Sequence, residues 1–382
     1  EKSEVRYVGG FIRKNVKKEV IDDIDLATNL KPSEVCEALK NKNINFYETG
    51  IEHGTVTAII DEYKYEITSL RKDLTTDGRH AKVEFSSDWK EDSLRRDFSI
   101  NSIYSDQDGN LFDPNNGKKD LEEGRINFIG DAETRIKEDY IRILRYVRFF
   151  INYSKLKHKP EIIKIIKRNI DGVYKLSNDR LLDEFKKLTK SNGFLKLFKD
   201  NESLELIEII FPQLKNLKIF KKLNEYAKDN FPKLDFIFVL SLMIVDGTDN
   251  SDYFIYKFNV SKKDQKRLRL INNFYKEKVN IKNFNEKNLN KFFYFNGKEA
   301  VIDIINFKIF ISNKVEKKLV KLVKIYNDKV TPTMPIGADI LMTKYNIPEG
   351  RTLGRKLKMI EEIWVNNNFN ISEKQIQRIA KS

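Results

Sequence analysis

The sequence predicts an α+β N-terminal part, a mixed β-sheet with helices, followed by an elongated all-α remainder. Up to about residue 130, short alternating runs of apolar residues are separated by glycine and polar clusters, which is typical of strands and turns. Beyond residue 131 the apolar residues recur with the period of amphipathic helices. The chain has 382 residues, of which 40% are hydrophobic, and this length allows two or three domains with buried cores.

The N-terminal part contains several short runs with the two-residue period of a strand. The first run ends in Gly9-Gly10, and the second is flanked by acidic residues. Two later runs separated by a polar turn indicate a hairpin. The expected elements are strands at 4–8 and 24–28, a helix at 32–40, and the hairpin strands at 55–60 and 64–70.

The helical remainder begins with a long amphipathic segment, for which we expect one helix over 136–153. Prolines and glycines separate the later helices, and basic helices dominate from residue 261 onward. Further helices are expected at 162–169, 178–189, 194–198 and 204–210. We divide the chain into a head at 1–130, a neck at 131–190, a body at 191–280 and a tail at 281–382.

The charge balance favours a polyanionic partner. Lys and Arg number 71 against 57 acidic residues, a net charge of +14, which suits nucleic acid or a membrane surface. The alternative is that the excess of positive charge reflects a generally lysine-rich composition and no particular partner. A single cysteine, Cys36, excludes a disulfide scaffold and a cysteine-cluster metal site. No apolar run is long enough to span a bilayer, and we expect a soluble protein of the cytoplasm.

Two carboxylates stand on one strand. Asp23 and Asp25 are two positions apart at the start of the strand expected at 24–28, so both would project to the same side. Paired oxygen ligands suit Mg²⁺, although a solvated loop end is the alternative for this pattern alone. Gly9-Gly10 would let backbone N–H groups approach a phosphate, with Arg13 as the countercharge.

Several separate segments together resemble the CCA-adding tRNA nucleotidyltransferases, in the branch that includes bacterial poly(A) polymerases. The segment 8–13 with 23–28 resembles the first motif of that family, and the segment 91–101 resembles the second motif. The matching segments also include 66–73 with 76–81 for a flexible loop, 135–149 for a nucleotide-template helix and, more loosely, 335–357 for the C-terminal module.

The resemblance implies an N-terminal nucleotidyltransferase head and template-independent addition of CCA to the 3′ end of tRNA. The substrates would be CTP and ATP, and the cofactor Mg²⁺ on Asp23 and Asp25, in a two-metal transfer that releases pyrophosphate. The flexible loop, at 71–79 here, would switch the enzyme from adding C to adding A. The nucleotide contacts that the resemblance assigns are Arg96, Asp139, Arg142, Arg145 and Arg148.

The template helix can also be argued from hydrogen bonding. Asp139 and Arg142 are at i and i+3, neighbours on one face of a helix. An ionised Asp only accepts and an Arg only donates. Cytosine and adenine both present an amino donor beside a ring-nitrogen acceptor, whereas guanine and uracil reverse that polarity. One Asp–Arg pair can therefore accept C or A and reject G and U.

Some alternatives stay open at this stage. Lys14 occupies a position where the family usually has Asp, which puts the local path and fine phosphate positioning in doubt. A poly(A) polymerase, a CC- or A-adding relative and an inactive basic RNA-binding protein are the rival functions. The sequence does not decide whether Glu91 or Asp92 adds a third metal carboxylate, nor the oligomeric state. Two basic groups, Lys314–Lys329 and Arg351–Lys358, would contact tRNA phosphates.

Overall fold

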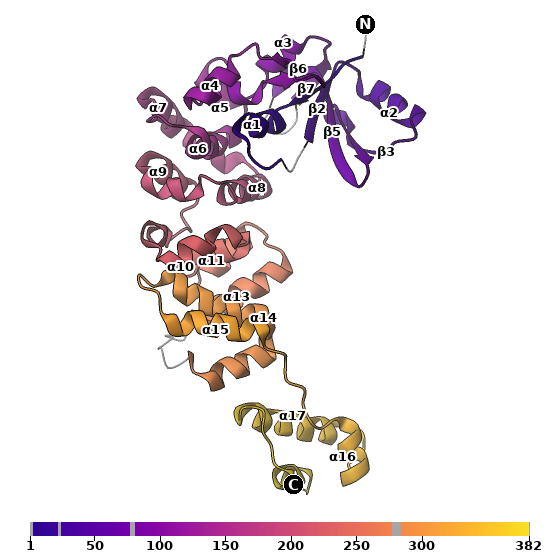
Figure 1. The fold of residues 1–382 in the computed structure, drawn as a ribbon, viewed down its shortest axis with the longest axis vertical. Helices are drawn as coiled ribbons and strands as arrows, with labels where there is room; N and C mark the ends of the chain where they lie inside the picture. The colour runs from indigo at the N-terminus through magenta and orange to yellow at the C-terminus, as the bar shows by residue number, and fades with distance from the viewer. Residues whose placement is uncertain (1–2, 22–23, 77–80, 277–283, 382) are drawn as a thin grey trace. The chain divides into compact units, whose positions relative to one another are not determined.

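The computed structural model describes residues 3–21, 24–76, 81–276 and 284–381, without the side chains of 49 and 73–82 (Figure 1). The chain forms two compact units, Glu1–Pro212 and Gln213–Ser382. The first begins with a mixed sheet and the remainder is helical, so the predicted α+β part followed by an all-α region is confirmed. The finer division into head, neck, body and tail stays a prediction.

A seven-stranded sheet in the order β3-β4-β5-β2-β1-β8-β9 forms the start of unit 1. β2 runs parallel to β5, and the other neighbouring strands are antiparallel. The sequence missed β3 and the short strands β8 and β9. The strands are β1 (Val5–Val8), β2 (Ile24–Thr28), β3 (Asn45–Gly50), β4 (Thr55–Ile60), β5 (Tyr63–Ser69), β8 (Tyr104–Ser105) and β9 (Leu111–Phe112).

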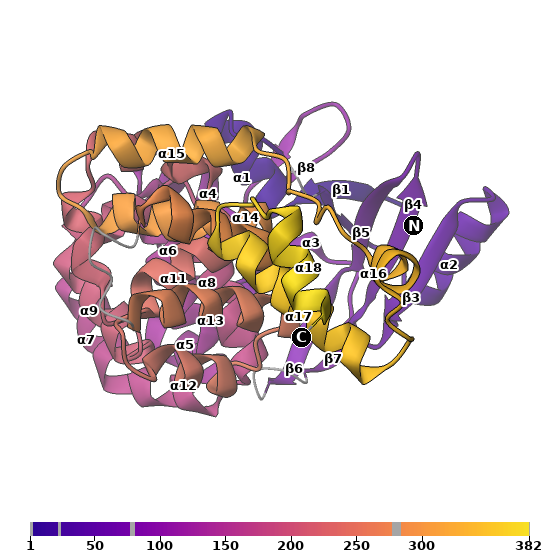
Figure 2. The ribbon, with the colours of Figure 1, turned by 90° about the horizontal axis from the view of Figure 1, so that it is seen from below.

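Helix α2 (Pro32–Asn41) covers one face of the sheet, where it lies along β3 and β4 (Figure 2). Val35 and Leu39 of this helix pack against Val56 and Ala58 of β4 in one buried cluster. Because side chains alternate along a strand, Thr57 of β4 points to the other face, on which Asp25 and Glu66 also lie. Helix α2 therefore lies on the face opposite Asp25 and Glu66.

A separate two-stranded hairpin, β6 (Arg71–Thr76) and β7 (Ala81–Phe85), follows β5. It corresponds to the expected flexible loop, whose residues 77–80, Gly78 included, lie outside the described residues. At its base, Leu70 is buried with Val8, Ala27 and Tyr104 in the core of the sheet.

The helices of unit 1 differ from the expectation at two places, one of which is the helix expected at 194–198, a 3₁₀ helix over Phe194–Lys199. The helix expected over 136–153 is two helices, α5 and α6, because Asp139 between them has φ −155° and ψ 104°. In Figure 1, α6 and α8 lie next to each other, and these helices are in contact. The helices are α1 (Gly10–Lys17), α3 (Trp89–Leu94), α4 (Gly117–Glu123), α5 (Ala132–Glu138), α6 (Ile141–Tyr153), α7 (Pro160–Asn169), α8 (Asn178–Thr189) and α9 (Asn201–Ile210).

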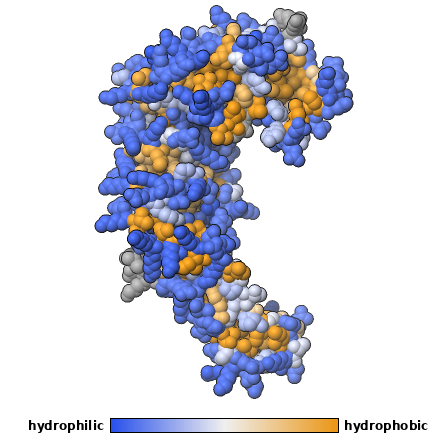
Figure 3. Space-filling model, viewed as in Figure 1, coloured by the Kyte–Doolittle hydropathy of each residue, from blue (hydrophilic) through white to orange (hydrophobic). Residues whose placement is uncertain are grey.

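Unit 2 is helical throughout its described part. Helix α14 is kinked at Gly297, which has φ 82° and ψ 177°, a conformation that glycine adopts without strain. Hydrophilic side chains cover most of the face seen in Figure 3, with smaller hydrophobic patches between them. The helices are α10 (Glu225–Asn230), α11 (Phe236–Ile244), α12 (Asn250–Lys257), α13 (Lys262–Lys276), α14 (Glu286–Ile311), α15 (Lys317–Asp328), α16 (Ala338–Tyr345), α17 (Arg351–Asn366) and α18 (Glu373–Lys381).

Within the described residues, every helix is too short or too polar to traverse a bilayer.

Candidate active site

The Gly9-Gly10 turn brings three parts of the chain together. Gly9 has φ 65°, a left-handed conformation that favours glycine, and Gly10 begins α1. A Cβ atom on either glycine would lie 3.5 Å from Asp25 Oδ2, and one on Gly9 would also lie 3.8 Å from Arg96 Nη1. The glycine turn, the carboxylate strand and the second motif therefore meet at one place, as the sequence predicted for a phosphate site.

Asp25 has a carboxylate neighbour that the sequence analysis missed. In the parallel ladder between β2 and β5, Asp25 is in register with Glu66, so the two side chains leave the same face on strands about 5 Å apart. Glu66 is exposed. Asp23 lies outside the described residues. The alternation of apolar and polar residues at 64–70 was a signal for Glu66, but the pairing of the two strands was not readable from the sequence.

Asp92 is a fully buried carboxylate that receives hydrogen bonds from several sides. Its Oδ1 accepts from the Arg71 backbone N–H at 3.2 Å and from Arg95 Nε at 2.7 Å. Its Oδ2 accepts from Tyr104 Oη at 2.6 Å and from Arg96 Nη2 at 3.1 Å. Burial alone would raise the pKa of Asp92, but Arg96 and Arg95 outweigh it and lower the pKa to about 2.

Both candidates for a third metal carboxylate, Asp92 and Glu91, are engaged in contacts with other side chains. A carboxylate offers about four lone-pair sites, and those of Asp92 are occupied by the contacts above. Glu91 accepts from Ser86 Oγ at 2.6 Å and pairs with Lys72 at 3.3 Å, at the base of the hairpin. Asp92 and Glu91 therefore position the arginines and the hairpin, and Glu66 has the better geometry for a partner of Asp25.

Arg13 is a buried side chain, 7% exposed. It donates to Asn101 Oδ1, and its guanidinium lies over the rings of Phe149 at 4.7 Å and Tyr153 at 5.4 Å. Nη2 of Arg13 remains near Gly10, 3.9 Å from where a Cβ would stand. Arg13 thus links the glycine turn to α6. Lys14, the departure from the family pattern, lies inside α1 and does not interrupt the helix.

The arginines of α6 form a row held by carboxylates. Arg145 Nε lies 3.0 Å from Asp97 Oδ2, an ion pair without hydrogen-bond geometry. Arg148 pairs with Glu184 of α8, which is buried. Burial works to lower the pKa of Arg145, but Asp97, Glu184 and Asp139 outweigh it and raise that pKa. Arg145 therefore stays cationic, whereas burial lowers the pKa of Arg148 although Glu184 works to raise it.

The expected helical pairing of Asp139 with Arg142 is wrong in its geometry, because Asp139 lies between α5 and α6 in an extended conformation. Asp139 Oδ2 instead accepts from Arg180 of α8 at 2.7 Å. Arg142 Nη1 donates to Glu138 Oε2 and to the Arg135 carbonyl, each at 2.6 Å. The sequence analysis missed Arg180, although Arg180 and Glu184 share one face of α8 at i and i+4.

Arg135 connects the second motif to α5. Its Nη2 donates to the carbonyl oxygens of Arg95 at 2.5 Å and Arg96 at 2.7 Å. Its Nη1 pairs with Glu138 at 2.5 Å, the carboxylate that also holds Arg142. A continuous set of contacts therefore runs from Asp92 and Arg96 to the start of α6. Each described site residue that the sequence predicted belongs to this region of unit 1.

Comparison with known proteins agrees with these motifs. Residues 5–127 match the family model of the Poly A polymerase head domain. The chain is 31% identical over 308 residues to the CCA-adding enzyme of Staphylococcus haemolyticus, covering 79% of this chain and 72% of that protein. It is 30% identical over 307 residues to the CCA-adding enzyme of Listeria monocytogenes, covering 74% of that protein.

The human mitochondrial CCA tRNA nucleotidyltransferase 1 is 39% identical over 237 residues, and the match spans 55% of that relative. The chain thus covers about half the length of the vertebrate mitochondrial relatives it matches. The crystal structure of the Bacillus stearothermophilus CCA-adding enzyme in complex with CTP superposes with a TM-score of 0.77 at 19% identity, over 99% of this chain and 93% of that one. The fold and the motifs agree, and the chain belongs to the family of CCA-adding enzymes, the tRNA nucleotidyltransferases.

Proposed function

We propose that this protein adds CCA to the 3′ end of tRNA from CTP and ATP without a nucleic-acid template. The observation that carries the proposal is the meeting of Asp25, Gly9-Gly10 and Arg96, with Arg13 linking that turn to the arginine row of α6. Carboxylates, backbone amides and guanidinium groups at one place are what transfer of a nucleotide onto a hydroxyl requires.

The carboxylates suit a divalent metal. Asp25 and the exposed Glu66 present hard oxygen ligands from neighbouring strands on the same sheet face, the ligand type that Mg²⁺ prefers. The turn lies directly beside Asp25, because a Cβ on Gly9 or Gly10 would be in van der Waals contact with Oδ2 at 3.5 Å. Asp25, Asp23 and Glu66 would hold the metal, which when bound would acidify the attacking hydroxyl and stabilise charge on the phosphate.

The residues of this chain would position the reactants for in-line displacement. The RNA 3′-oxygen loses its proton to water and bonds to the α-phosphorus, while the bond between the α-phosphorus and the bridging oxygen breaks and pyrophosphate leaves. The Gly10 N–H and Arg96 neutralise the departing phosphates, and Arg13 holds the turn in place. No side chain becomes covalently attached, so orientation and electrostatics provide the acceleration.

Base selection would come from Asp139 and Arg142. Arg180 occupies Oδ2 of Asp139, and Oδ1 retains a free lone-pair direction beside its long 3.3 Å contact with the Ile141 N–H. Arg142 uses Nη1 for its recorded hydrogen bonds, and a guanidinium has five N–H donors. An incoming C or A can therefore be read without displacing Arg180 or Glu138.

The hairpin would control the change from C to A. Its first residue, Arg71, donates its backbone N–H to Asp92, which also binds Arg96. A displacement of β6 would therefore shift Asp92, and with it the position of Arg96 at the nucleotide. Deleting Lys72–Gly78 is expected to leave CC addition and to abolish the terminal A, read as product length on a sequencing gel. Survival of terminal A addition would refute this role.

The partner would be tRNA, held partly by the basic residues of unit 2. Helix α15 buries Leu319 and Tyr326 and exposes a lysine face, as the sequence predicted. In the second basic group, Lys356 donates to the last carbonyls of α18 at 2.9 Å and is structural, whereas the remaining cations are exposed. The exposed cations are Lys317, Lys318, Lys321, Lys324, Arg351, Arg355 and Lys358.

A poly(A) polymerase is the second candidate, because the matching family model is that of the Poly A polymerase head domain. Such an enzyme would extend RNA with ATP alone and would not need CTP. The location of the protein in the cytoplasm stays a prediction. The human relative is named as a mitochondrial enzyme.

The experiment that tests the proposal replaces Asp25. Asp25→Ala should abolish incorporation of both CTP and ATP into tRNA lacking its 3′ CCA, while the dissociation constant for that tRNA stays within about twofold. Asp108→Ala, in an exposed turn with no contact to the site, is the matched control and should keep full activity. Undiminished incorporation by the Asp25 variant would refute the assignment of the site.

A further inference from the structure

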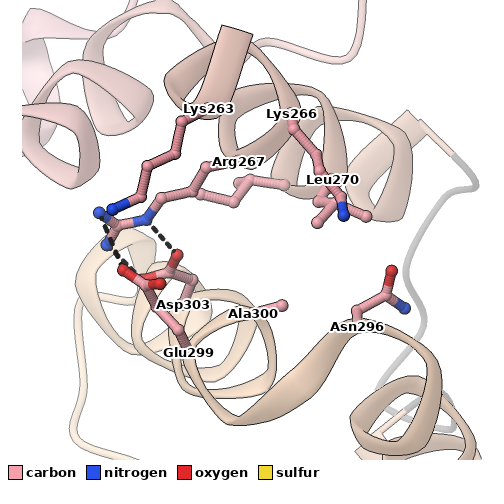
Figure 4. Close-up of a pocket in the computed structure, with 9 residues that line it drawn as sticks. Lys263, Lys266, Arg267, Leu270, Asn296, Glu299, Ala300 and Asp303 are labelled. Atoms are coloured by element: carbon pink, nitrogen blue, oxygen red, sulfur yellow. Dashed lines mark hydrogen bonds and ion pairs between the residues drawn. The ribbon is translucent and has the colours of Figure 1, made fainter.

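The cavity between α13 and α14 in unit 2, of about 170 Å³, is lined by groups of both charges (Figure 4). Arg267 pairs there with Asp303 at 2.6 Å and with Asp235 at 2.9 Å, so its guanidinium is already engaged. Lys266 and Glu299 line the same space. Mixed and internally paired charges stabilise the packing of the two helices and select no particular ligand. The contact that bears on the site lies in unit 1.

In unit 1, the ring of Tyr140 packs against the backbone of Gly172. Tyr140 directly precedes α6, and Gly172 is a buried residue of the 3₁₀ helix η3 (Ile170–Lys175). A Cβ atom on Gly172 would overlap Cε1, Cδ1 and Cζ of the ring, each well under 3.0 Å away, whereas carbon atoms in contact lie about 3.5–4.0 Å apart. Only glycine at position 172 therefore lets the ring approach this closely.

This contact fixes the residue next to Asp139. Asp139 and Tyr140 form the junction between α5 and α6, where Asp139 is extended and the Tyr140 carbonyl accepts from the Ile143 N–H at 3.1 Å. Lys175 of η3 adds a cation 5.9 Å from the centre of the Tyr140 ring. Because the ring is held against η3, the start of α6 cannot shift without breaking that packing.

Consecutive elements of the chain hold both residues of the junction. The Asp139 carboxylate accepts from Arg180 at 2.7 Å, and Arg180 lies in the first turn of α8, the helix that follows η3. The direction in which Asp139 presents its remaining oxygen therefore depends on two contacts. One is the ion pair with Arg180, and the other is the steric contact of Tyr140 with Gly172.

We propose that the contact between Tyr140 and Gly172 positions Asp139 for reading the incoming base, an inference that rests on the proposed function and assigns part of its nucleotide selectivity to these two residues. Groups that read a ligand must be held within about 0.5 Å of their working position. A methyl group at position 172 would displace the ring by more than about 1 Å, and Asp139 would move with it. Tyr140 and Gly172 are thus positioning residues, which act on the nucleotide through Asp139.

The test compares Gly172→Ala with a matched control on the same helix. In Gly193→Ala the new Cβ would overlap the Ile151 carbonyl oxygen and lie 2.7 Å from Asn152 Oδ1, at the opposite end of α6. The control therefore strains the same unit without reaching Asp139. The measurements are kcat and KM for CTP, ATP and UTP with tRNA lacking its 3′ CCA, the dissociation constants of CTP and UTP without tRNA, and the midpoint of thermal unfolding.

Gly172→Ala should lower the ratio of kcat/KM for CTP over that for UTP by about 10- to 100-fold, chiefly through a higher KM for CTP. It should also reduce the preference of the free protein for binding CTP over UTP. Gly193→Ala should lower the unfolding midpoint by a similar amount and keep both ratios. Equal ratios in the two variants would overturn the proposal.

Substitutions of Tyr140 test the same contact without a clash. Tyr140→Ala should lower the selectivity for CTP over UTP, and Tyr140→Phe, which retains the ring, should keep it. Adding Gly172→Ala to Tyr140→Ala should cause no further loss, because the ring that the new Cβ would strike is gone. A loss of selectivity in the Phe variant as large as in the Ala variant would contradict the role of the ring.

Failure of this inference is distinguishable from failure of the proposed function. If the unaltered protein adds CCA and the Gly172 and Tyr140 variants keep its selectivity, the inference fails and the proposed function stands. If the unaltered protein prefers CTP over UTP in binding but adds no nucleotide, the catalytic proposal fails, and loss of that preference in Gly172→Ala supports the contact. Equal binding and incorporation of CTP and UTP by the unaltered protein would overturn both.

Discussion

Replacing Asp92 by Asn is expected to lower the folding stability of the head of the protein and also to weaken nucleotide binding. Asp92 is 0% exposed and joins the hairpin base to Arg95 and Arg96. Its pKa falls from 3.8 to about 2, which corresponds to roughly 2 kcal/mol of stability at neutral pH. Because the folded-state pKa is the lower one, this stability is present above pH 3.8 and is lost as the pH falls toward 2.

Asparagine removes that charge and turns one acceptor into a donor that faces other donors. Removing one partner of a buried ion pair costs about 3–5 kcal/mol of stability. The midpoint temperature of thermal unfolding of the head should therefore fall by roughly 6–20 °C for a unit of this size. The KM for CTP and ATP should rise, since Arg96 loses the group that orients it.

The measurement can be confined to the head. The chain has two tryptophans, Trp89 beside Tyr104 in unit 1 and Trp364 in unit 2. In a Trp364→Phe background, fluorescence therefore reports on Trp89 alone. Asp88→Asn is the matched control, because Asp88 caps the same helix from the surface and Asn caps a helix as well as Asp does. Equal midpoints and KM values in the two variants would refute the reasoning.

Three further outcomes follow from the contacts. Arg180→Ala, which frees Asp139 from its 2.7 Å ion pair, should raise UTP misincorporation without a large loss of stability, and Arg180→Lys should restore part of the selectivity. Arg267→Ala should destabilise unit 2 by about 3–5 kcal/mol in urea unfolding, because Asp303 is 5% exposed; the double variant with Asp303→Leu should recover much of that. Gly9→Ala, at φ 65°, should cost about 1–2 kcal/mol and raise the KM for CTP, and an unchanged KM would contradict the role of the turn.

Much of the head could be predicted because its signals are local. The patterns at 24–28 and 64–70 predicted two central strands, and Gly9-Gly10 predicted the turn that follows the first strand. The parallel pairing of β2 with β5, which places Glu66 beside Asp25, depends on a contact between segments about 40 residues apart. Neither periodicity nor residue type specifies such a pairing.

The template region shows the opposite error, an over-regular expectation. Apolar residues keep a helical period through 136–153, yet Asp139 leaves the helix. Its side chain meets Arg180 of α8, and Arg142 meets Glu138 of α5. Tertiary ion pairs therefore outweigh the local helical preference at this junction, which a period count cannot register.

The most direct measurement of the central claim is the product formed from tRNA lacking its 3′ end when the four nucleoside triphosphates are offered singly and together. The account predicts addition of C alone with CTP, completion by one A with CTP and ATP together, and no use of GTP or UTP. A long homopolymer from ATP alone would contradict it, as would incorporation of G or U at a comparable rate.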